Sequence, residues 1–485
     1  MLRLGRRRGH GGFTVGVIGG VLLALEALGF ATGTAGVIGI GALIAVVAAM
    51  TLARTSLRTV AIGATLGAAF FTSWNGFLVG PARPGDLLIF VALACFIAAD
   101  LRSSIPGLPW WIQQVAGLII LVAVLNEVLP TDPNYLAGRL VLAADGTPYI
   151  ENQSNLGVAF KFVVGIALLP LVFVLAARHD RRLIRWLTIA FCLGVAVSGF
   201  AAFTDHLGLT HLGQSLTHNV YPRDREGGFS NHANFLGAGC VLATAPAVWL
   251  ACHADRRTRI LGCFALPAIL LGVYATGSRG ATVGSAIALV LAIVIQPRLR
   301  KHLPTIAFAG ACVAGAAFVA SPSLGAALLR ATRLGGGTTT VSGSDYVRSL
   351  VGEQGIHDFF HSPIDGIGLQ VAAEAQNVYI QELASGGVLL FAGMLLFMVG
   401  SLIESYRLWN VSDLARSLFV TIVATAILNF AEADLSDRFY YAPAGLIAAL
   451  AYWHKVDTEA AARTTVEAEA GAEDATPPAL AGATT

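Results

Sequence analysis

Residues 158–176 read VAFKFVVGIALLPLVFVLA, and Lys161 is the one charged side chain among them. A helix of about 20 mostly apolar residues crosses the hydrocarbon core of a bilayer, because lipid offers the backbone no hydrogen-bond partners. Similar apolar stretches recur along almost the whole chain. They lie near residues 13–30, 34–52, 59–72, 86–99, 112–129, 158–176, 187–203, 234–251, 260–275, 280–295, 306–320, 387–403, 418–430 and 441–453. The sequence therefore predicts an all-α, polytopic integral membrane helix bundle with about 12–14 transmembrane helices.

The composition agrees with this fold class. Of the 485 residues, 55% are hydrophobic and 12% are charged, and the mean hydropathy is +0.70. A soluble domain carries about 25% charged residues. The six cysteines lie in predicted spans or at their inner ends, and none belongs to a C-x-x-C pair. Neither an external disulfide framework nor a zinc site is indicated.

The basic residues orient the predicted helices, because short cytoplasmic loops retain Lys and Arg during membrane insertion. With a cytoplasmic N-terminus, 21 of the 31 basic residues fall inside, although the outer loops are much longer. The remaining 10 are Arg83, Arg139, Lys161, Arg223, Arg225, Arg279, Arg330, Arg333, Arg348 and Arg438. The prediction is a multi-pass protein of the bacterial cytoplasmic (inner) membrane with both termini in the cytoplasm.

The predicted spans belong to one membrane domain, residues 1–455. The basic cluster at residues 6–8 also fits the start of a signal peptide, but no small-x-small cleavage site ends the following apolar run cleanly, so a first transmembrane helix is expected. Residues 456–485 are rich in Ala, Thr and Glu and are expected to form a disordered cytoplasmic tail.

Two outer loops are long enough to carry structure of their own. The polar, turn-rich loop at 130–157 is expected to be a surface cover. The large extracytoplasmic loop at 321–386 is expected to contain short amphipathic helices at 324–334 and 345–360. The apolar side chains that recur near helical spacing in the second of these are Val347, Leu350, Val351, Phe359 and Phe360.

Four short polar or glycine-rich motifs lie on the predicted outer side. They are GFSNHAN at 228–234, TGSRG at 276–280, the stretch from DYVR at 345–348 to HSPIDGIG at 361–368, and QNVY at 376–379 with Gly386-Gly387 behind it. A charge at membrane depth, such as that of Arg279, is expensive unless it is paired. Arg279 therefore either lies at the interface and bridges an outer acid, or holds a lipid-linked phosphate, which the planar guanidinium fits well.

In this order the four motifs resemble those of the O-antigen ligase and polymerase superfamily. The resemblance covers roughly residues 222–387, and the flanking helices by architecture only. It implies a metal-independent membrane glycosyltransferase without cofactors that works at the outer face in cell-surface polysaccharide biosynthesis. Its implied partners are a polyprenyl pyrophosphate-linked glycan donor, a glycan or lipid acceptor and membrane lipid, with no nucleic acid. Ligase and polymerase both remain open.

The resemblance also implies the site residues. Arg279 and Arg348 match motif positions and are expected to stabilise the charge that develops on the leaving pyrophosphate. The expected substrate-binding residues are Arg223, Arg225, Asn231, His232, Asn234, Gln376 and Asn377. No metal ligand is expected.

One position departs from the family's pattern. The family's ligases usually have histidine, thought to be the general base, where this chain has Gln376. Glutamine does not titrate, so it orients a hydroxyl but takes no proton. Either His361 or Glu374 is the catalytic base, or the protein relies on leaving-group stabilisation, or it performs a related reaction.

Two further hypotheses concern the remaining outer acids and the function class. Glu432, Asp434 and Asp437 with Arg438 are candidates to hold a site arginine by a salt bridge. A membrane transporter or flippase of lipid-linked or small polar substrates would have a similar number of spans, but it should show broken helices, midplane charges and repeat symmetry. A non-catalytic envelope-assembly scaffold would need no outer arginines.

Overall fold

The computed structural model describes residues 56–78, 83–99, 106–139, 154–217, 225–301, 304–305, 308, 339–370, 376–431 and 437–474. The chain divides into two compact units, Met1–Val60 and Ala61–Thr485, and the second holds every contact discussed below. The described residues form helices and contain no strand.

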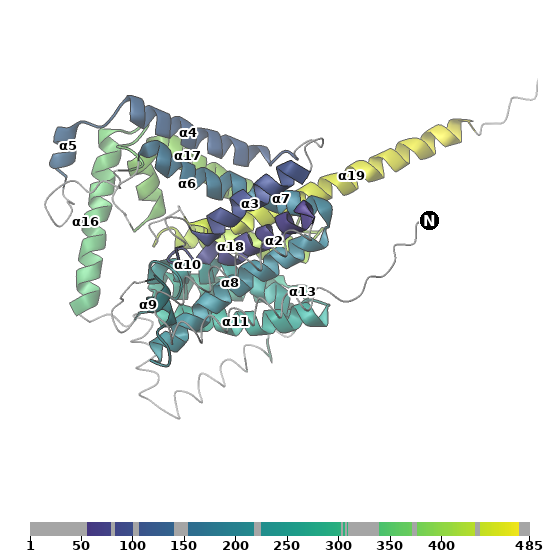
Figure 1. Cartoon of the computed structure of the whole chain (residues 1–485), viewed down its shortest axis with the longest axis horizontal. Coiled ribbons are helices and arrows are strands. Elements are labelled where there is room, and N and C mark those ends of the chain that lie inside the picture. Colours follow the sequence, from purple (N-terminus) through teal and green to yellow (C-terminus); the bar gives the residue numbers. More distant parts are fainter. Residues whose placement is uncertain are drawn as a thin grey trace, which may run out of the picture. The chain divides into compact units, whose positions relative to one another are not determined.

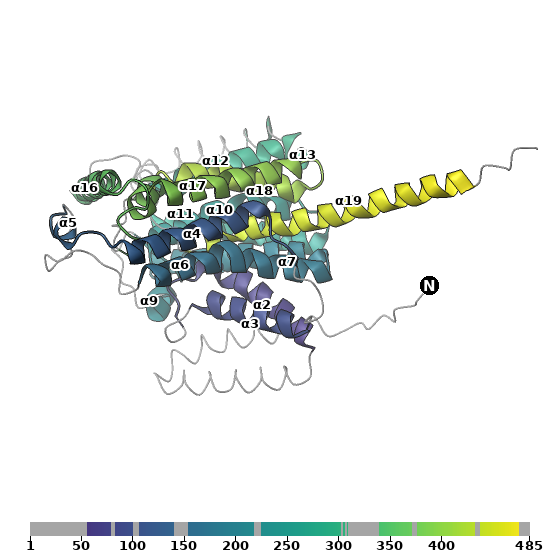
Figure 2. The same cartoon turned by 90° about the horizontal axis from the view of Figure 1, so that it is seen from above.

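In chain order the described elements are α2 (Leu57–Phe70), η1 (Phe71–Ser73), α3 (Pro84–Ala99), α4 (Trp110–Val128), α5 (Pro133–Ala137), α6 (Asn155–Val163), η2 (Val164–Leu168), α7 (Leu169–His179), α8 (Arg182–His206), α9 (Leu212–Thr217), α10 (Ala233–Ala251), α11 (Arg256–Thr276), α12 (Arg279–Ile295), α13 (Pro297–Arg300), α16 (Thr339–His361), α17 (Val378–Arg407), α18 (Asp413–Leu428), η3 (Arg438–Tyr440) and α19 (Ala442–Asp474). Figures 1 and 2 show their arrangement.

Six described helical segments are long and apolar enough to cross a membrane. They are α4, the continuous segment α6–η2–α7, α8, α10, α11 and α17. Shorter apolar helices are formed by α2 with η1, by α3 and by α12. The prediction of a helical membrane bundle is thus confirmed in its coarse form. The predicted stretches near 13–30 and 34–52, and nearly all of that near 306–320, lie outside the described residues.

The two ends of the bundle carry different elements. The helices α5, α9 and α16 lie at one end, and α13 lies at the other, where α19 projects (Figures 1 and 2). We call these the α16 end and the α13 end. The α13 end carries the arginines at the helix ends and turns there, Arg178, Arg181, Arg256, Arg298 and Arg407. The α16 end carries Arg139, Arg225, Arg279 and Arg348.

Residues 158–176 lie in one continuous helical segment that contains a π-helical turn. From Asn155 to His179 the backbone stays helical, but Val164–Leu168 is a π-helical turn in which the Leu169 N–H donates to the Val164 carbonyl. Pro170 follows at once, and proline has no N–H to donate to the preceding turn. A π-bulge is a common way for a helix to accommodate such a break.

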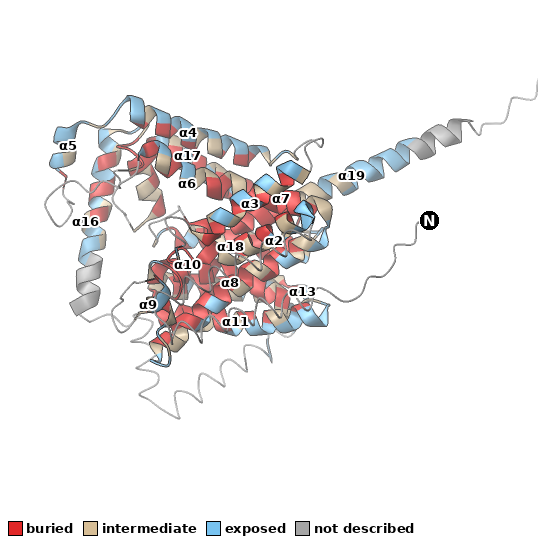
Figure 3. Ribbon diagram, in the orientation of Figure 1, coloured by how far each residue is buried: buried red, intermediate tan, exposed pale blue. Residues whose placement is uncertain are grey.

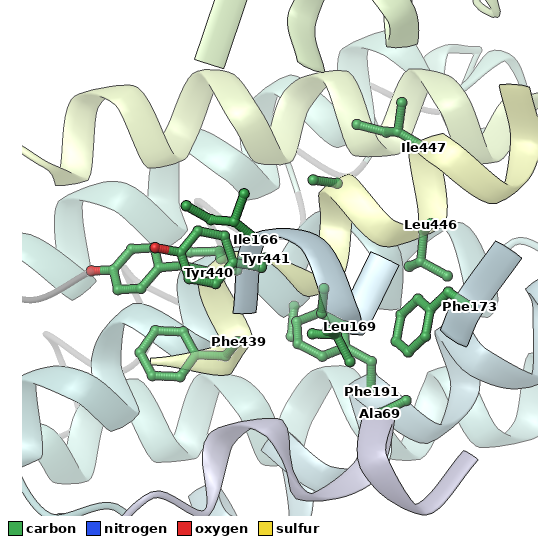
Figure 4. Packing of buried hydrophobic residues seen from close by; sticks show 14 of the residues in the cluster. Ala69, Ile166, Leu169, Phe173, Phe191, Phe439, Tyr440, Tyr441, Leu446 and Ile447 are labelled. Atoms are coloured by element: carbon green, nitrogen blue, oxygen red, sulfur yellow. The ribbon is translucent and has the colours of Figure 1, made fainter. Parts of the chain in front are cut away.

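Small residues set the spacing between the buried helices. Figure 3 shows the buried residues concentrated in the centre of the bundle, and 94% of the span in α10 is buried. In membranes, Gly and Ala at interfaces allow close backbone approach. Figure 4 shows Tyr440 and Tyr441 beside Ile166 in the main core, where Tyr441 is 1% exposed.

The glycine pair of the fourth motif breaks helix α17. At Gly387, φ is 60° and ψ is −157°, a conformation that is essentially confined to glycine. The segment 363–368 lies in the break, where the Val388 N–H donates to the Pro363 carbonyl at 2.8 Å and the Ile367 N–H donates to the Ala384 carbonyl at 2.9 Å. The predicted span near 387–403 is therefore only the second part of a longer, discontinuous helix.

The two helices predicted in the large outer loop have different outcomes. The predicted helix at 345–360 forms as α16, but its buried face is partly polar, because Gln354 and Asp358 are buried while Val347 and Phe360 are exposed. The predicted helix at 324–334 lies outside the described residues.

The tail expected to be disordered, 456–485, is helical to Asp474 as the end of α19. Ala and Glu favour helix, and residues 457–466 are all exposed, so this extension adds nothing to the core. Residues 475–485 lie outside the described residues.

Candidate functional site

The TGSRG motif is the turn between α11 and α12. Helix α11 ends at Thr276, and Gly277 follows in the left-handed region with φ 57°. The Ser278 hydroxyl then accepts the Ala281 N–H at 3.3 Å and caps α12. Glycine is favoured at position 277 because the backbone there is left-handed, and serine is favoured at position 278 because its hydroxyl caps the helix.

The turn makes Arg279 the first residue of α12, where its side chain is half-buried. The N-terminal end of a helix carries a partial positive charge, so a cation is disfavoured there and an anion is favoured. The position of Arg279 is thus poor for helix stability, and it is well suited to an anionic ligand that the guanidinium and the helix end bind together.

The GFSNHAN motif lies beside this turn. Gly237, in the first turn of α10, packs so closely on it that a Cβ there would lie 2.7 Å from the Cβ of Ala281. Arg225 joins the two motifs, because its Nε donates to the Thr276 carbonyl at 3.0 Å and its Nη2 donates to the Asn234 side-chain oxygen. The Glu226 N–H also donates to the Ala275 carbonyl at 2.9 Å. Much of the Arg225 fork is therefore used to hold the site together.

His232 begins α10 and is flanked by two arginines. Its Nδ1 accepts the Asn234 N–H at 3.1 Å. Burial, with the charges of Arg225 and Arg348, lowers the pKa of His232 to about 4. The imidazole is thus neutral at neutral pH, and the half-buried Arg348 of α16 lies near the N-terminus of α10.

The loop that follows η1, residues 74–78, contacts the GFSNHAN motif. The Asn231 N–H donates to the Asn75 side-chain oxygen at 3.0 Å, and the Gly76 N–H donates to the Phe229 carbonyl at 3.0 Å. The Trp74 ring packs on Phe229 with centroids 4.3 Å apart. The Asn231 side chain is exposed, so the motif is fixed through its backbone while this amide faces outward.

Of the three acids near the last turn, Asp437 lies within the described residues, and it pairs with Arg83. Asp437 accepts from Arg83 at 2.7 Å and from the Asn75 amide. Arg438 forms a two-bond pair with Asp86 at 2.5 and 2.9 Å. Asp437 thus supports the site indirectly, through Asn75. Glu432 and Asp434 lie outside the described residues.

The structure places one of the two proposed bases, His361, away from the site arginines. His361 is exposed and stacks on Tyr135, with ring centroids 3.6 Å apart. It lies 13 residues after Arg348 on one continuous helix, or about 20 Å along the axis at 1.5 Å per residue. His361 is therefore not brought to the arginines. Glu374 and Arg223 lie outside the described residues.

The QNVY motif forms the start of α17. Asn377 caps this helix, since its side-chain oxygen accepts the N–H groups of Tyr379 and Ile380 at 3.0 and 3.3 Å. Gln376 has a φ of 51°, and it is the non-glycine residue with positive φ among the described residues. Such conformations cost of order 1–3 kcal/mol and cluster at functional sites. The strain keeps Gln376 a candidate, while Asn377 already has a structural role.

A carboxyl pair beside the site has no signal in the sequence. Glu226 and Asp205 are each 6% exposed. Asp205 accepts from the Leu212 and Gly213 N–H groups at 2.9 and 2.7 Å and so holds α9. Burial, and next the charge of Asp205, raises the pKa of Glu226 to about 7. Glu226 therefore takes up a proton near neutral pH.

This raised pKa makes a prediction for stability. The folded protein binds the Glu226 proton more tightly than the unfolded chain does, so its contribution is full below pH 4.5 and is lost as the pH rises to about 7. Between pH 5.5 and 7.5 we expect a loss of roughly 2 kcal/mol in the free energy of unfolding. Glu226→Gln should remove it, measured by thermal unfolding in detergent. The exposed control Glu353→Gln should retain the wild-type pH dependence, and an unchanged dependence in Glu226→Gln would contradict the assignment.

The fold and site define a polytopic helical membrane protein with an arginine-rich cluster at one end of its bundle. Comparison with protein-family models and with curated proteins gives no match to this chain. Within the described ranges, no group of three or more His, Cys, Asp and Glu side chains lies together in a way that would hold a metal ion. The cationic side chains near the starts of α10 and α12 are the guanidinium groups of Arg225, Arg279 and Arg348.

Proposed function

We propose that this protein is a membrane glycosyltransferase that moves or polymerises a glycan from a polyprenyl pyrophosphate carrier onto a glycan or lipid acceptor. The observation that carries the proposal is the meeting of Arg225, His232 and Arg348 at the N-terminus of α10, beside the turn that begins with Arg279. Two helix N-termini and several arginines at one place favour a ligand with more than one negative charge, such as pyrophosphate.

The main requirement of the proposed reaction is stabilisation of the negative charge that develops on the leaving pyrophosphate. An acceptor hydroxyl oxygen bonds to C1 of the donor glycan, the bond from C1 to the phosphate oxygen breaks, and its electron pair stays on the pyrophosphate. Arg279 and Arg348 then bind the growing negative charge, and Arg225 with Asn234 keeps the two motifs in place. The neutral His232 offers a hydrogen bond without adding a further charge. The hydroxyl proton passes to solvent or to a phosphate oxygen.

Transfer from a lipid-pyrophosphate donor by the purified protein tests the proposal. Because arginines supply the positive charge, turnover should survive EDTA, with less than a twofold change expected. Abolition by EDTA and restoration by Mg²⁺ or Mn²⁺ would contradict the arginine mechanism, and absence of transfer with a competent donor and acceptor would contradict the function itself.

The proposal also requires the α16 end to face outward in the bacterial cytoplasmic membrane. Glu353 is exposed on α16, so Glu353→Cys should react with a membrane-impermeant maleimide in intact cells. Asp457→Cys, on the exposed part of α19, is the matched inner control and should react only after permeabilisation. The reverse pattern would contradict the topology and the proposed chemistry with it.

The break in α17 favours a second candidate, a transporter or flippase, because transporters use discontinuous helices. In this chain, however, the backbone groups at the break are hydrogen-bonded to residues 363–368. They are thus occupied by the chain and not presented to an ion or substrate. Movement of a fluorescent lipid-linked substrate across proteoliposomes without glycan transfer would favour this second function.

A further inference from the structure

The loop segment at 131–139, predicted to be a surface cover, is joined to α16 by a buried polar cluster. One Asp358 oxygen accepts from the Tyr135 hydroxyl at 2.9 Å and from the Gln354 amide at 2.7 Å. The other accepts from Arg139 at 2.7 Å. The Arg139 and Asp358 side chains are 0% and 1% exposed. We call Tyr135, Arg139, Gln354 and Asp358 the α5–α16 clamp.

We propose that the α5–α16 clamp positions Arg348, so that the outer segment 131–139 is part of the working site. The part of this inference that concerns turnover rests on the proposed function. A buried ion pair is a weak source of stability, because desolvation offsets the attraction, but its directional bonds specify one geometry. The α5–α16 clamp is therefore better explained by the alignment of Arg348 than by a gain in folding stability.

The geometry of α16 shows what the clamp would align. Arg348 and Asp358 lie ten residues apart on one helix, about 15 Å along its axis and about 80° apart around it. Rotation of α16 about its axis would therefore swing Arg348 away from α10. Two hydrogen bonds from outside α16, donated by Tyr135 and Arg139, oppose that rotation because each has a preferred direction, and the Gln354 bond within α16 orients the carboxylate.

The C-terminal end of α16 is held separately. The Asn126 amide donates to the Asp365 carbonyl at 2.8 Å, and the Thr131 hydroxyl donates to the Ile367 carbonyl at 2.7 Å. These contacts, with those in the α17 break, fix where the helix ends. The clamp lies between that end and Arg348 and ties the body of α16 to α5 and the residues just after it. His361, stacked on Tyr135, extends it.

The test measures geometry and turnover in the same variants of the full chain. Asp358→Asn removes the charge, and the double variant Arg139→Met with Asp358→Leu replaces the pair by apolar side chains of similar size, which commonly keep a protein folded. The matched control is Asp457→Asn, which breaks the exposed pair of Arg181 and Asp457. Spin labels at Glu353→Cys on α16 and Phe200→Cys on α8, with other accessible cysteines replaced by serine, report the distance between the two helices.

We expect a broader distance distribution in both clamp variants and a wild-type distribution in the control. Turnover should fall roughly 10- to 100-fold in kcat with less than a threefold change in donor KM, as for a misplaced catalytic group. A distribution in the double variant as narrow as in the wild type would overturn the inference. The distance measurement decides the clamp even if the wild type transfers no glycan, an outcome that would count against the proposed function alone.

Discussion

Replacement of Gly387 by alanine should reduce or abolish the yield of folded protein. The conformation at this position is essentially restricted to glycine, and forcing another residue into it costs about 1–3 kcal/mol. A Cβ would also lie 2.6 Å from the Pro363 carbonyl oxygen and still closer to the Ile364 backbone. Backbone atoms cannot move aside as a flexible side chain can, so the total should exceed 3 kcal/mol.

Detergent-extracted monodisperse yield and thermal unfolding would measure this effect. Gly117→Ala in α4 is the matched control, because nothing lies within 4 Å of a Cβ there and alanine favours helix. The control should unfold at or slightly above the wild-type temperature. If Gly387→Ala unfolded with the control, the close docking of 363–368 in the α17 break would be wrong.

Most of the described transmembrane helices can be predicted from the sequence, because membrane thickness sets the length of the apolar run that crosses it. The predicted stretches near 234–251, 260–275 and 280–295 lie within α10 (Ala233–Ala251), α11 (Arg256–Thr276) and α12 (Arg279–Ile295). Lipid imposes helix on any apolar run of that length, so local composition is sufficient. The same reasoning cannot place the start of α17, because its first turns are polar and become helical through contacts with 363–368 and α18.

The buried face of α16 shows a second limit. The apolar spacing predicts an amphipathic helix with Val347 and Phe360 on its apolar face, but it does not reveal that Gln354 and Asp358 are buried against Tyr135 and Arg139. Such pairing between distant segments leaves no periodic signal in one sequence. It also overrides the rule that charged residues stay exposed, since a buried charge is tolerated where it is paired and hydrogen-bonded.

Only part of the candidate site could be predicted from the sequence. The resemblance singles out 228–234 and 276–280 separately, and the structure joins these two motifs through Arg225. His361 was one alternative for the base because Gln376 departs from the expected histidine, and the structure stacks it on Tyr135. The Glu226–Asp205 pair was missed, because the pKa of Glu226 is raised only when folding buries this carboxyl beside Asp205.

Arg279 should show the largest effect on turnover. If its guanidinium binds the pyrophosphate with two parallel hydrogen bonds, Arg279→Lys keeps the charge but loses the fork, and Arg279→Ala loses both. A charge-assisted contact used mainly in the transition state is worth about 2–4 kcal/mol, or roughly 30- to 1000-fold in rate. The loss of rate should therefore lie near the upper end of this range in Arg279→Ala and nearer the lower end in Arg279→Lys.

A structural role for Arg279 predicts a different pattern. A membrane-interface anchor tolerates lysine, because both side chains extend to the headgroup region. The helix N-terminus also disfavours a cation, so Arg279→Ala should leave the protein folded while turnover falls. Arg407→Lys, at an exposed position paired with Glu404, is the matched control and should be silent. Wild-type turnover by Arg279→Lys, at equal protein level in the membrane, would assign Arg279 to the scaffold, and the pyrophosphate site would then have to be built around Arg348.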